Sequence, residues 1–414
     1  MQYGLIGKKL GHSFSKEIHH QIDAYDYILK EIPEEELDSF MKSKDFKGIN
    51  VTIPYKQDVI PYLDFIDENA EKIGAVNTIV NKDRKLFGYN TDFIGLRKMI
   101  VNEGIELKGK KVLILGTGGT SRTACAVAES LEAGSVIIVS RSEKKNTITY
   151  EKASVEHNDA QVIINTTPSG MFPSVDSKPI DLSHFKKLEG VVDVIFNPLR
   201  TKLVVEAQKS RVKACGGLFM LVQQAVSASE LFFEKTIPSS KVFEIYGDII
   251  SKKRNIVLTG MPGCGKSSVG KRLSAELKMP CFDSDEEIIK REGMTPAQII
   301  SQKGEQEFRK IESEVIKELC LKNNIIISTG GGAVLKDENI IRLKNNGLIF
   351  FIDRSIDKIR PTTDRPLSDS QDKLKKLFDI RYPVYCETAD FQITSDEVIE
   401  HTVNKIIQKF REER

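Results

Sequence analysis

Residues 255–268, NIVLTGMPGCGKSS, decide the fold of the last part of the chain. The apolar run 255–259 has the composition of a buried strand, and GMPGCGKS at 260–267 fits the pattern G-x-x-x-x-G-K-[ST]. Apolar residues then recur at helical spacing over 269–277. A strand, a glycine-rich turn and a helix in this order form a loop whose backbone N–H groups face a phosphate. The stretch therefore predicts a site for a nucleoside triphosphate.

Each residue type in this loop has a physical task. Glycines let the backbone turn inward, the Lys266 ammonium can reach the outer phosphates, and the Ser267 hydroxyl is placed to bind Mg²⁺. The residues expected to contact the nucleotide here are Gly260, Gly263, Cys264, Gly265, Lys266, Ser267 and Ser268.

Length and composition restrict the remaining possibilities. A chain of 414 residues predicts two to three domains, and 40% hydrophobic with 29% charged residues is typical of a globular protein with sizeable cores. The 61 Lys and Arg residues almost balance the 59 Asp and Glu residues, which gives no reason to expect a nucleic acid or an anionic membrane as partner. We expect small-molecule substrates and no obligate protein partner.

The six cysteines are scattered and lack the spacing of a metal site or a redox motif. The sequence does not open with the apolar core of a signal peptide, and no apolar run approaches the ~20 residues of a membrane span. These features predict a protein of the reducing cytoplasm.

Residues 1–102 alternate between strand-like and helix-like segments, which predicts an α/β fold. Strands are expected at 3–7, 26–32, 48–53 and 75–80, and helices after Ser15 as cap, after Pro33, from Lys56 and over 93–101. Ser13 and Ser15 alternate in the polar loop GHSFS, so both hydroxyls can donate to an anion such as a carboxylate.

Four polar side chains follow the expected strand ends of this region: Thr52, Lys56, Asn77 and Asp92. In open α/β sheets, ligands bind beyond the carboxyl ends of the strands. A lysine and an aspartate that meet at such an edge can share a proton. The set therefore predicts a substrate site on the first sheet.

The segment KVLILGTGGTSR at 111–122 is an apolar strand that runs into a glycine turn and a helix, and a second apolar strand, SVIIVSR, follows at 135–141. This βαβ unit predicts a dinucleotide-binding fold, although Ser121 stands at the third glycine position of the fingerprint.

The end of the second strand indicates which dinucleotide binds. A site for NAD favours an acidic residue there, whereas this chain continues with Ser140, Arg141, Ser142, Lys144 and Lys145. Hydroxyl and cationic donors suit a 2′-phosphate, so NADP is favoured. The residues expected to contact NADP are Gly116, Gly118, Gly119, Ser121, Ser140, Arg141, Ser142 and Lys145.

Eight segments in order over residues 1–235 carry a family resemblance: GHSFSKEIHHQI, NVTIPYK, GAVNTI, NTDFIG, GTGGTSR, NTTPSGMFP, DVIFNPLRT and GGLFMLVQQA. Together they resemble the shikimate dehydrogenase family. The resemblance implies reduction of 3-dehydroshikimate by NADPH, with Lys56 and Asp92 as the catalytic pair. The substrate site that it implies consists of Ser13, Ser15, Thr52, Lys56, Asn77, Asp92 and Gln224.

One position departs from that family's pattern. Phe196 stands where the D-x-x-Y-x-P motif usually has a tyrosine. The phenylalanine keeps the ring but lacks a hydroxyl that would help to bind the substrate carboxylate. The departure therefore bears on substrate affinity and not on the reaction.

Further candidate ligands follow the phosphate-binding loop. The segment DSDEEI places Asp283 and Asp285 two residues apart at a strand end, so both carboxylates point the same way if the chain is extended. One can serve a metal ion and the other a substrate hydroxyl. EFRKIE puts Arg309 and Glu312 on one helix face, and the glycines of TGGGAV at 329–334 let the backbone approach a ligand.

These segments, together with RPL and RYPVY, resemble the shikimate kinase family across residues 253–414. The resemblance implies ATP-dependent phosphorylation of shikimate, with Lys266, Asp285 and Arg365 as catalytic residues. The implied shikimate ligands are Asp285, Arg309, Gly331, Gly332 and Arg381. Ser267 and Asp283 are the implied Mg²⁺ ligands, the latter directly or through water. Arg360, near the adenine, and Arg365, in a lid, complete the ATP site.

The expected architecture has three domains. A substrate-binding domain spans 1–102 with 218–247, a Rossmann-like NADP domain spans 103–217, and a P-loop kinase domain with a parallel sheet spans 253–414. Such a fusion catalyses consecutive steps of chorismate and aromatic amino acid synthesis. Two alternatives stay open: a quinate/shikimate dehydrogenase fused to a small-molecule kinase, or a chain in which one half only binds a ligand.

Overall fold

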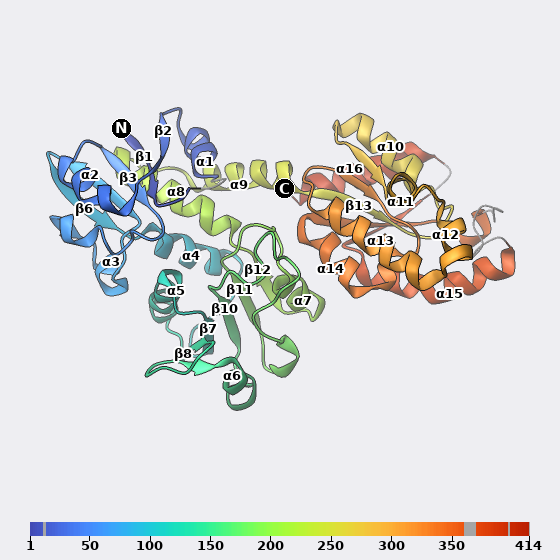
Figure 1. Ribbon diagram of the computed structural model, residues 1–414, viewed down its shortest axis with the longest axis horizontal. Coiled ribbons are helices and arrows are strands. Elements are labelled where there is room, and N and C mark those ends of the chain that lie inside the picture. The colour runs from blue at the N-terminus through green and yellow to red at the C-terminus, as the bar shows by residue number, and fades with distance from the viewer. Residues whose placement is uncertain (11–13, 360–369, 396–397, 414) are drawn as a thin grey trace. The chain divides into compact units, whose positions relative to one another are not determined.

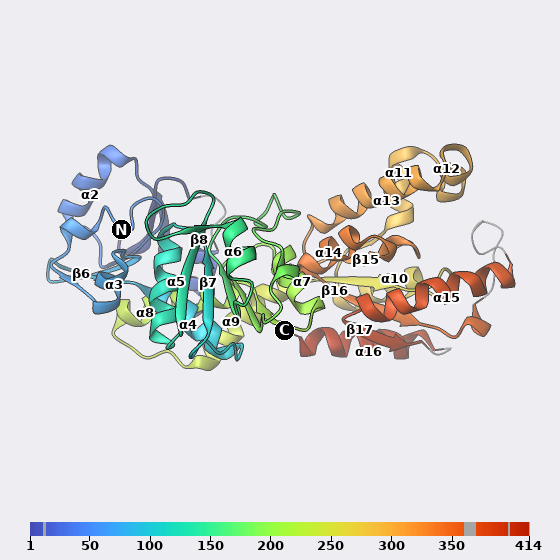
Figure 2. The ribbon, with the colours of Figure 1, turned by 90° about the horizontal axis from the view of Figure 1, so that it is seen from below.

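The computed structural model describes residues 1–10, 14–359, 370–395 and 398–413 (Figure 1). The chain divides into two compact units, Met1–Gly247 and Asp248–Arg414. The described residues form two sheets in the first unit and one in the second, and helices pack against each sheet (Figures 1 and 2). The expected α/β class is confirmed in both units. Within the described part of the chain, no helix combines the length and the apolar character that a membrane span requires.

The first sheet is mixed and has the strand order β2-β1-β3-β5-β6-β4. Its strands are β1 (Tyr3–Gly7), β2 (Tyr27–Glu31), β3 (Gly48–Val51), β4 (Phe65–Ile66), β5 (Thr78–Lys82) and β6 (Lys85–Tyr89), and the helices between them are α1 (Ser15–Ile22), α2 (Leu37–Ser43) and α3 (Glu68–Ile73). Strand β1 pairs in parallel with β2 and β3, whereas β5 is antiparallel to β3 and β6. Fully buried Ile6, Ile49 and Ile79 anchor its core.

Two local expectations for this region are wrong. The helix expected from Lys56 does not form, because residues 53–59 are turns that lead into the short 3₁₀ helix Ile60–Tyr62. The Lys56 carbonyl instead accepts a hydrogen bond from the N–H of Val76 at 2.7 Å. The strand expected at 75–80 begins late, at Thr78. The N–H of Val76 donates to the turn at Lys56 and not to a neighbouring strand.

The second sheet is parallel throughout, in the order β12-β11-β10-β7-β8-β9. Its strands are β7 (Lys111–Leu115), β8 (Ser135–Ser140), β9 (Ile148–Thr149), β10 (Val162–Asn165), β11 (Gly190–Asp193) and β12 (Lys213–Cys215), with helices α5 (Gly119–Ser130), α6 (Tyr150–Glu156) and α7 (Lys202–Lys209). Strand β7, helix α5 and strand β8 form the βαβ unit that the sequence predicts. The apolar residues of β7 are buried because helices cover both faces of a parallel sheet.

Helix α8 (Leu218–Phe233) follows β12 and packs along α4 (Thr91–Asn102). The two backbones meet at Gly95, where a Cβ atom would lie only 2.7 Å from the carbonyl oxygen of Met220. Any larger residue at this position would push the helices apart. The close packing brings Gln224 of α8 to the same cavity as Asp92 of α4.

The second unit holds a parallel sheet with the order β14-β15-β13-β16-β17. Its strands are β13 (Asn255–Thr259), β14 (Cys281–Asp283), β15 (Ile326–Ser328), β16 (Gly347–Asp353) and β17 (Phe391–Thr394). The helices are α10 (Lys266–Leu277), α11 (Ser284–Glu292), α12 (Pro296–Lys303), α13 (Glu305–Cys320), α14 (Asp337–Asn346), α15 (Gln371–Thr388) and α16 (Ile399–Glu412), while α9 (Ser239–Lys253) lies across the boundary of the units. Helices α10 and α16 pack together, as do α13 and α14 (Figures 1 and 2). Central strand β13 is buried along its whole length.

Candidate active sites

A cavity of about 450 Å³ lies in the first unit. Residues of β1 and β3, the starts of α4 and α5, helix α8 and the loop after β11 line it. It brings together the expected substrate residues Ser15, Thr52, Lys56, Asn77, Asp92 and Gln224. Ser13 lies outside the described residues. Ser15 is the first residue of α1 and not its cap, because Phe14 occupies the N-cap position.

The ion pair of this cavity joins Lys56 to Asp92, with Nζ and Oδ2 2.6 Å apart. Both side chains are partly buried, at 22% and 15% exposure. Asp92 stands in the first turn of α4, where Asn90 caps the helix by accepting a hydrogen bond from the N–H of Phe93. The pair is therefore held by a helix start on one side and by the turn that Val76 fixes on the other, and both side chains line the cavity.

Asn77 lines the cavity because of a strand direction that the sequence does not reveal. It precedes β5 instead of following it, but β5 runs antiparallel to β3, so the start of β5 lies at the same edge as the end of β3. The side-chain oxygen of Asn77 accepts a hydrogen bond from the N–H of Thr91 at 2.7 Å. This contact ties the residue to the first turn of α4.

Asn50 also lines the cavity, and the sequence analysis does not include it among the site residues. The alternation of side chains along a strand could have identified it from the sequence. Asn50 and Thr52 are two residues apart at the end of β3, so their side chains share one face. Asn50 is 5% exposed, and its amide donates to the Thr78 hydroxyl at 2.9 Å.

Phe196 lines the same cavity, in the loop after β11. Its ring meets that of Phe14 edge to face, with the centroids 6.0 Å apart. The Phe196 ring gives this part of the wall an apolar surface, which contrasts with the polar edge formed by Lys56 and Asp92.

The glycine turn after β7 has the geometry of a dinucleotide-binding loop. Gly116 has φ of +110°, which side-chain-bearing residues rarely adopt, and a Cβ atom there would meet the Thr166 hydroxyl at 2.8 Å. Gly118 and Gly119 have open space where a Cβ atom would stand, and Gly119 begins α5. A helix start with uncovered N–H groups suits a pyrophosphate. Gly119 lines the cavity, whereas Ser121 is buried in the helix.

The segment after β8 is arranged around Ser140 and Thr147. The Ser140 hydroxyl donates to the carbonyl of Ser142 and contacts the Thr147 hydroxyl at 3.0 Å. Thr147 in turn accepts a hydrogen bond from the N–H of Lys144. Ser140 therefore fixes the loop from within, while Arg141, Ser142, Lys144 and Lys145 are exposed on its outer side.

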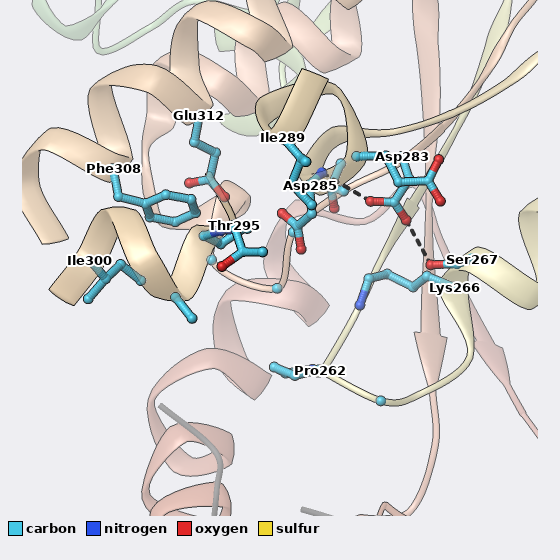
Figure 3. A pocket seen from close by; sticks show the side chains of 18 of the residues that line it. Pro262, Lys266, Ser267, Asp283, Asp285, Ile289, Thr295, Ile300, Phe308 and Glu312 are labelled. Carbon is cyan, nitrogen blue, oxygen red and sulfur yellow. Dashed lines mark hydrogen bonds between the residues drawn. The ribbon is translucent and has the colours of Figure 1, made fainter. Parts of the chain in front are cut away.

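A second cavity, of about 770 Å³, lies in the second unit (Figure 3). Among the expected residues it is lined by Gly263, Gly265, Lys266, Ser267, Ser268, Asp283, Asp285, Arg309, Gly331, Gly332 and Arg381. Gly260 and Cys264 are buried beside it. Arg360 and Arg365 lie outside the described residues.

The phosphate-binding loop adopts the backbone that its glycines allow. Gly263 and Gly265 have φ of +80° and +104°, and a Cβ atom at Gly265 would meet open space. The Lys266 ammonium donates to the carbonyl oxygens of Gly260 and Met261 at 2.9 and 3.0 Å. Helix α10 begins at Lys266, so the positive end of the helix and the ammonium face the same side. This arrangement fits the phosphates of a nucleotide.

Asp283 and Asp285 do not form the extended pair that their spacing predicts. Asp283 ends β14 and caps α11, accepting a hydrogen bond from the N–H of Asp285, which already belongs to the helix (Figure 3). The other oxygen of Asp283 accepts hydrogen bonds from the hydroxyls of Ser267 at 2.7 Å and Ser328 at 2.9 Å. Both carboxylates nevertheless line the cavity, because the chain turns between them.

Ser267 and Asp283 form a donor set that fits Mg²⁺. A hydroxyl and a carboxylate supply the hard oxygen atoms that Mg²⁺ prefers, and this ion keeps several waters and phosphate oxygens instead of a full protein cage. The described residues contain no cluster of three or more acidic, histidine or cysteine side chains suited to a metal.

A buried charge cluster lines the same cavity. Arg309 and Glu312 of α13 are paired at 2.8 Å, and Glu312 is fully buried. Burial raises the pKa of Glu312, although Arg309 opposes the shift. Arg381 of α15 is 4% exposed, and burial lowers its pKa. Two guanidinium groups that converge on a polar cavity suit a carboxylate ligand.

The glycines of 330–332 make room for this cluster. A Cβ atom at Gly332 would lie 2.3 Å from Nη1 of Arg309, and one at Gly330 would lie 2.8 Å from Asp285 and 2.9 Å from Glu312. Gly330 and Glu312 also line the cavity; the sequence analysis names their segments as candidates but does not place these two residues among the shikimate ligands. The three consecutive glycines and the three-residue spacing of Arg309 and Glu312 were the available signals.

Comparisons with known proteins follow the same division of the chain. Residues 5–79 match the shikimate dehydrogenase substrate binding domain, and residues 262–411 match shikimate kinase. A relative from Clostridium beijerinckii named shikimate dehydrogenase (NADP(+)) is 40% identical over 250 residues, which cover 56% of this chain and 92% of the relative. The chain belongs to the shikimate dehydrogenase family. Behind the dehydrogenase it carries a shikimate kinase domain, which makes it a bifunctional enzyme of the shikimate pathway.

Solved structures of shikimate dehydrogenases resemble the first part of this chain. A chorismate mutase/shikimate 5-dehydrogenase fusion protein from Clostridium acetobutylicum is 38% identical, with a TM-score of 0.57, and the match covers 60% of this chain and 96% of that one. The shikimate 5-dehydrogenase of Thermus thermophilus, solved in complex with NADP(H) and shikimate, is 26% identical, with a TM-score of 0.52, over 59% of this chain and 98% of that one. Shikimate and NADP(H) thus bind to a homologous structure.

Proposed function

We propose that the first unit reduces 3-dehydroshikimate to shikimate with NADPH and that the second unit phosphorylates shikimate at its 3-hydroxyl with ATP and Mg²⁺. The observation that carries the proposal is the same in both cavities: a nucleotide-binding glycine loop opens onto charged side chains suited to a small hydroxylated acid. The proposed domains are 1–102 with 218–247, 103–217 and 253–414. The proposal includes a cytoplasmic location, which agrees with six free cysteines.

In the dehydrogenase site, Lys56 is proposed to hold a proton at Nζ and to deliver it to the substrate oxygen on which negative charge grows. Asp92, 2.6 Å away, orients the ammonium. Bound NADPH supplies the hydride. The Ser15 hydroxyl at the start of α1 binds the substrate carboxylate, and Ser13 stays a predicted contact of it, while Thr52, Asn77 and Gln224 bind the other oxygens of the substrate.

The cofactor contacts are proposed from the loop geometry. The glycine turn at 116–119 and the start of α5 bind the pyrophosphate, with Ser121 supporting the turn from within the helix. Arg141, Ser142 and Lys145 bind the 2′-phosphate from the outer side of the loop that Ser140 fixes. These donors favour NADPH over NADH.

In the kinase site, the residues are proposed to position and neutralise charge, which is most of what phosphoryl transfer requires. Arg309 and Arg381 bind the shikimate carboxylate beside the backbone of Gly331 and Gly332, and Asp285 aligns the 3-hydroxyl. Lys266 and the N–H groups of its loop hold the phosphates. Arg360 and Arg365 stay predicted contacts of ATP.

Ser267 and Asp283 would hold the Mg²⁺ ion that accompanies ATP. The ion would supply positive charge to the phosphate oxygens. The Ser328 hydroxyl, which donates to the same Asp283 oxygen as Ser267, would keep that carboxylate in place.

Two rate comparisons on the purified chain test the proposal. Reduction of NADP⁺ should depend on shikimate and exceed both the rate with NAD⁺ and the rate with quinate. Release of ADP from ATP should depend on shikimate and on Mg²⁺. A preference for quinate or NAD⁺ would favour a quinate/shikimate dehydrogenase, and a silent half would show that this half only binds its ligand.

A further inference from the structure

A chain of buried hydrogen bonds runs behind the wall of the dehydrogenase cavity. It joins Tyr27 of β2, Asn50 of β3, Asn77 and Thr78 at the start of β5, and Thr91 of α4, each of which is at most 5% exposed. Only Asn50 and Asn77 line the cavity. No member carries a charge at neutral pH, so the chain acts through the direction of its hydrogen bonds.

The backbone fixes the direction at Asn50. The Nδ2 atom of Asn50 lies 3.3 Å from the carbonyl oxygen of Asn77 and 2.9 Å from the Thr78 hydroxyl. A carbonyl oxygen only accepts, so the nitrogen of the amide must face it, and the oxygen of the amide must face the other way. That oxygen lies 2.7 Å from the Tyr27 hydroxyl, which is therefore the donor.

The same reasoning about donors and acceptors fixes the orientation of the Asn77 side-chain amide. The N–H of Thr91 only donates, and it lies 2.7 Å from Oδ1 of Asn77. The Thr78 hydroxyl accepts from Asn50, so its own proton is directed to Oδ1 of Asn77 or to the Thr91 hydroxyl. In the second case the Thr91 hydroxyl donates to Oδ1 of Asn77 at 3.2 Å, so a hydroxyl proton holds this oxygen inward either way. The amide nitrogen is the donor that Asn77 has left for the cavity.

The Tyr27 ring is itself held in place. It stacks on the His19 ring with the centroids 3.8 Å apart and the planes 10° apart. Burial lowers the pKa of His19 to about 3, so this neighbour stays neutral and places no charge beside the chain. The hydroxyl of Tyr27 is thus presented to Asn50 by a rigid neutral stack.

We propose that Tyr27 is a positioning residue of the dehydrogenase. Its hydroxyl holds Asn50 in the direction that the backbone sets, and Asn50 in turn holds Thr78 and Asn77, so that an amide donor faces the cavity and recognises an oxygen of a hydroxylated cyclic substrate. The inference rests on the proposed function, because it names a residue that sets the substrate affinity of that same site.

The test compares Tyr27→Phe with Tyr25→Phe. Tyr25 belongs to the same aromatic cluster, but its hydroxyl contacts His19 and Ser229 instead of Asn50. Loss of the Tyr27 hydroxyl should raise KM for shikimate about 3- to 10-fold, the usual effect of one lost hydrogen bond, with KM for NADP⁺ unchanged. Tyr25→Phe should leave KM for shikimate at the wild-type value. The shikimate kinase rate of each variant controls for the quality of the protein.

A double variant distinguishes a positioning role of Tyr27 from a general loss of packing around the site. If Tyr27 acts through Asn50, then Tyr27→Phe should add nothing to the KM of Asn50→Ala, whereas independent effects would multiply. Thr78→Val, which breaks the next link, should reproduce the KM effect and replaces Tyr27→Phe if that variant does not fold.

The outcomes distinguish the two claims. A wild-type chain without shikimate-dependent NADP⁺ reduction overturns the proposed function. If the wild type is active, three results would overturn the positioning role alone. Tyr27→Phe would keep the wild-type KM, it would have the same KM as Tyr25→Phe, or its effect on KM would multiply with that of Asn50→Ala.

Discussion

At the scale of the residue, Phe196 stands where the D-x-x-Y-x-P pattern leads one to expect a tyrosine. Its ring lines the cavity against Phe14 and offers no hydrogen bond. Phe196→Tyr should lower KM for shikimate by a factor that corresponds to roughly 0.5–1.5 kcal/mol, because a phenol can donate to the carboxylate. Steady-state kinetics of both proteins measure the effect. An unchanged or higher KM would show that other groups already bind that oxygen.

Asp193 gives a prediction about stability. It is fully buried between Asn165 and Thr201, which donate to it at 3.0 and 2.6 Å. Burial raises its pKa from 3.8 to about 6, and hydrogen bonds from Thr201, the N–H of Ile195 and Asn165 only partly offset this shift. Between pH ~4 and ~6 the folded chain therefore keeps a proton that the unfolded chain has lost, so the stability due to Asp193 falls as the pH rises through this window.

Asp193→Asn removes this titration and keeps the shape of the side chain. We therefore compare the melting temperature of the variant minus that of wild type at two pH values. This difference should be larger at pH 7 than at pH 4.5. The unfolding transition to follow is the one whose midpoint temperature shifts when NADP⁺ is added. An equal difference at both pH values would show that Asp193 does not titrate in this range.

Some site residues could be predicted from the sequence and others could not. Lys56 and Asp92 were selected as a polar pair at an α/β sheet edge, and the structure places them 2.6 Å apart. Asn50 was not selected, because a lone polar residue in a strand gives no sign of which cavity it will face. Its place in the site depends on packing between elements that are distant in sequence.

At the scale of the element, the glycine loop 330–332 sets the size of the kinase cavity. Gly330→Ala would place a Cβ atom within 3 Å of two carboxylates, those of Asp285 and the fully buried Glu312. We expect kcat/KM for shikimate in the kinase reaction to fall more than about 10-fold, since misplacing a positioned group costs this much or more. Dehydrogenase kinetics of the same variant serve as the control, and wild-type kinase kinetics would contradict the account.

The errors of element prediction have one physical origin. The start of β5 and the turn at Lys56 both depend on a hydrogen bond between Lys56 and Val76, twenty residues apart. Local propensity does not contain such a contact, and it does not reveal that β5 is antiparallel to β3. By contrast, β13 was predicted to the residue, because its apolar centre at 256–258 and the glycine turn directly after it mark a buried parallel strand.

At the scale of the whole molecule, the two sites belong to different compact units. Lys56→Ala should remove most NADPH oxidation and leave shikimate phosphorylation near wild type, and Lys266→Ala should do the reverse. Both rates are measured on each folded variant. Loss of both activities from either single change would refute the assignment of one reaction to each unit.

The central claim is that one chain carries out two consecutive reactions. The most direct measurement supplies the wild-type protein with 3-dehydroshikimate, NADPH, ATP and Mg²⁺ and follows NADPH, ADP and shikimate 3-phosphate together. The account predicts that shikimate 3-phosphate forms, with one ADP released for each molecule made and one NADPH oxidised for each molecule of shikimate produced. If NADPH is oxidised while shikimate accumulates and no ADP appears, or if ADP appears only when shikimate is added from outside, the claim is contradicted.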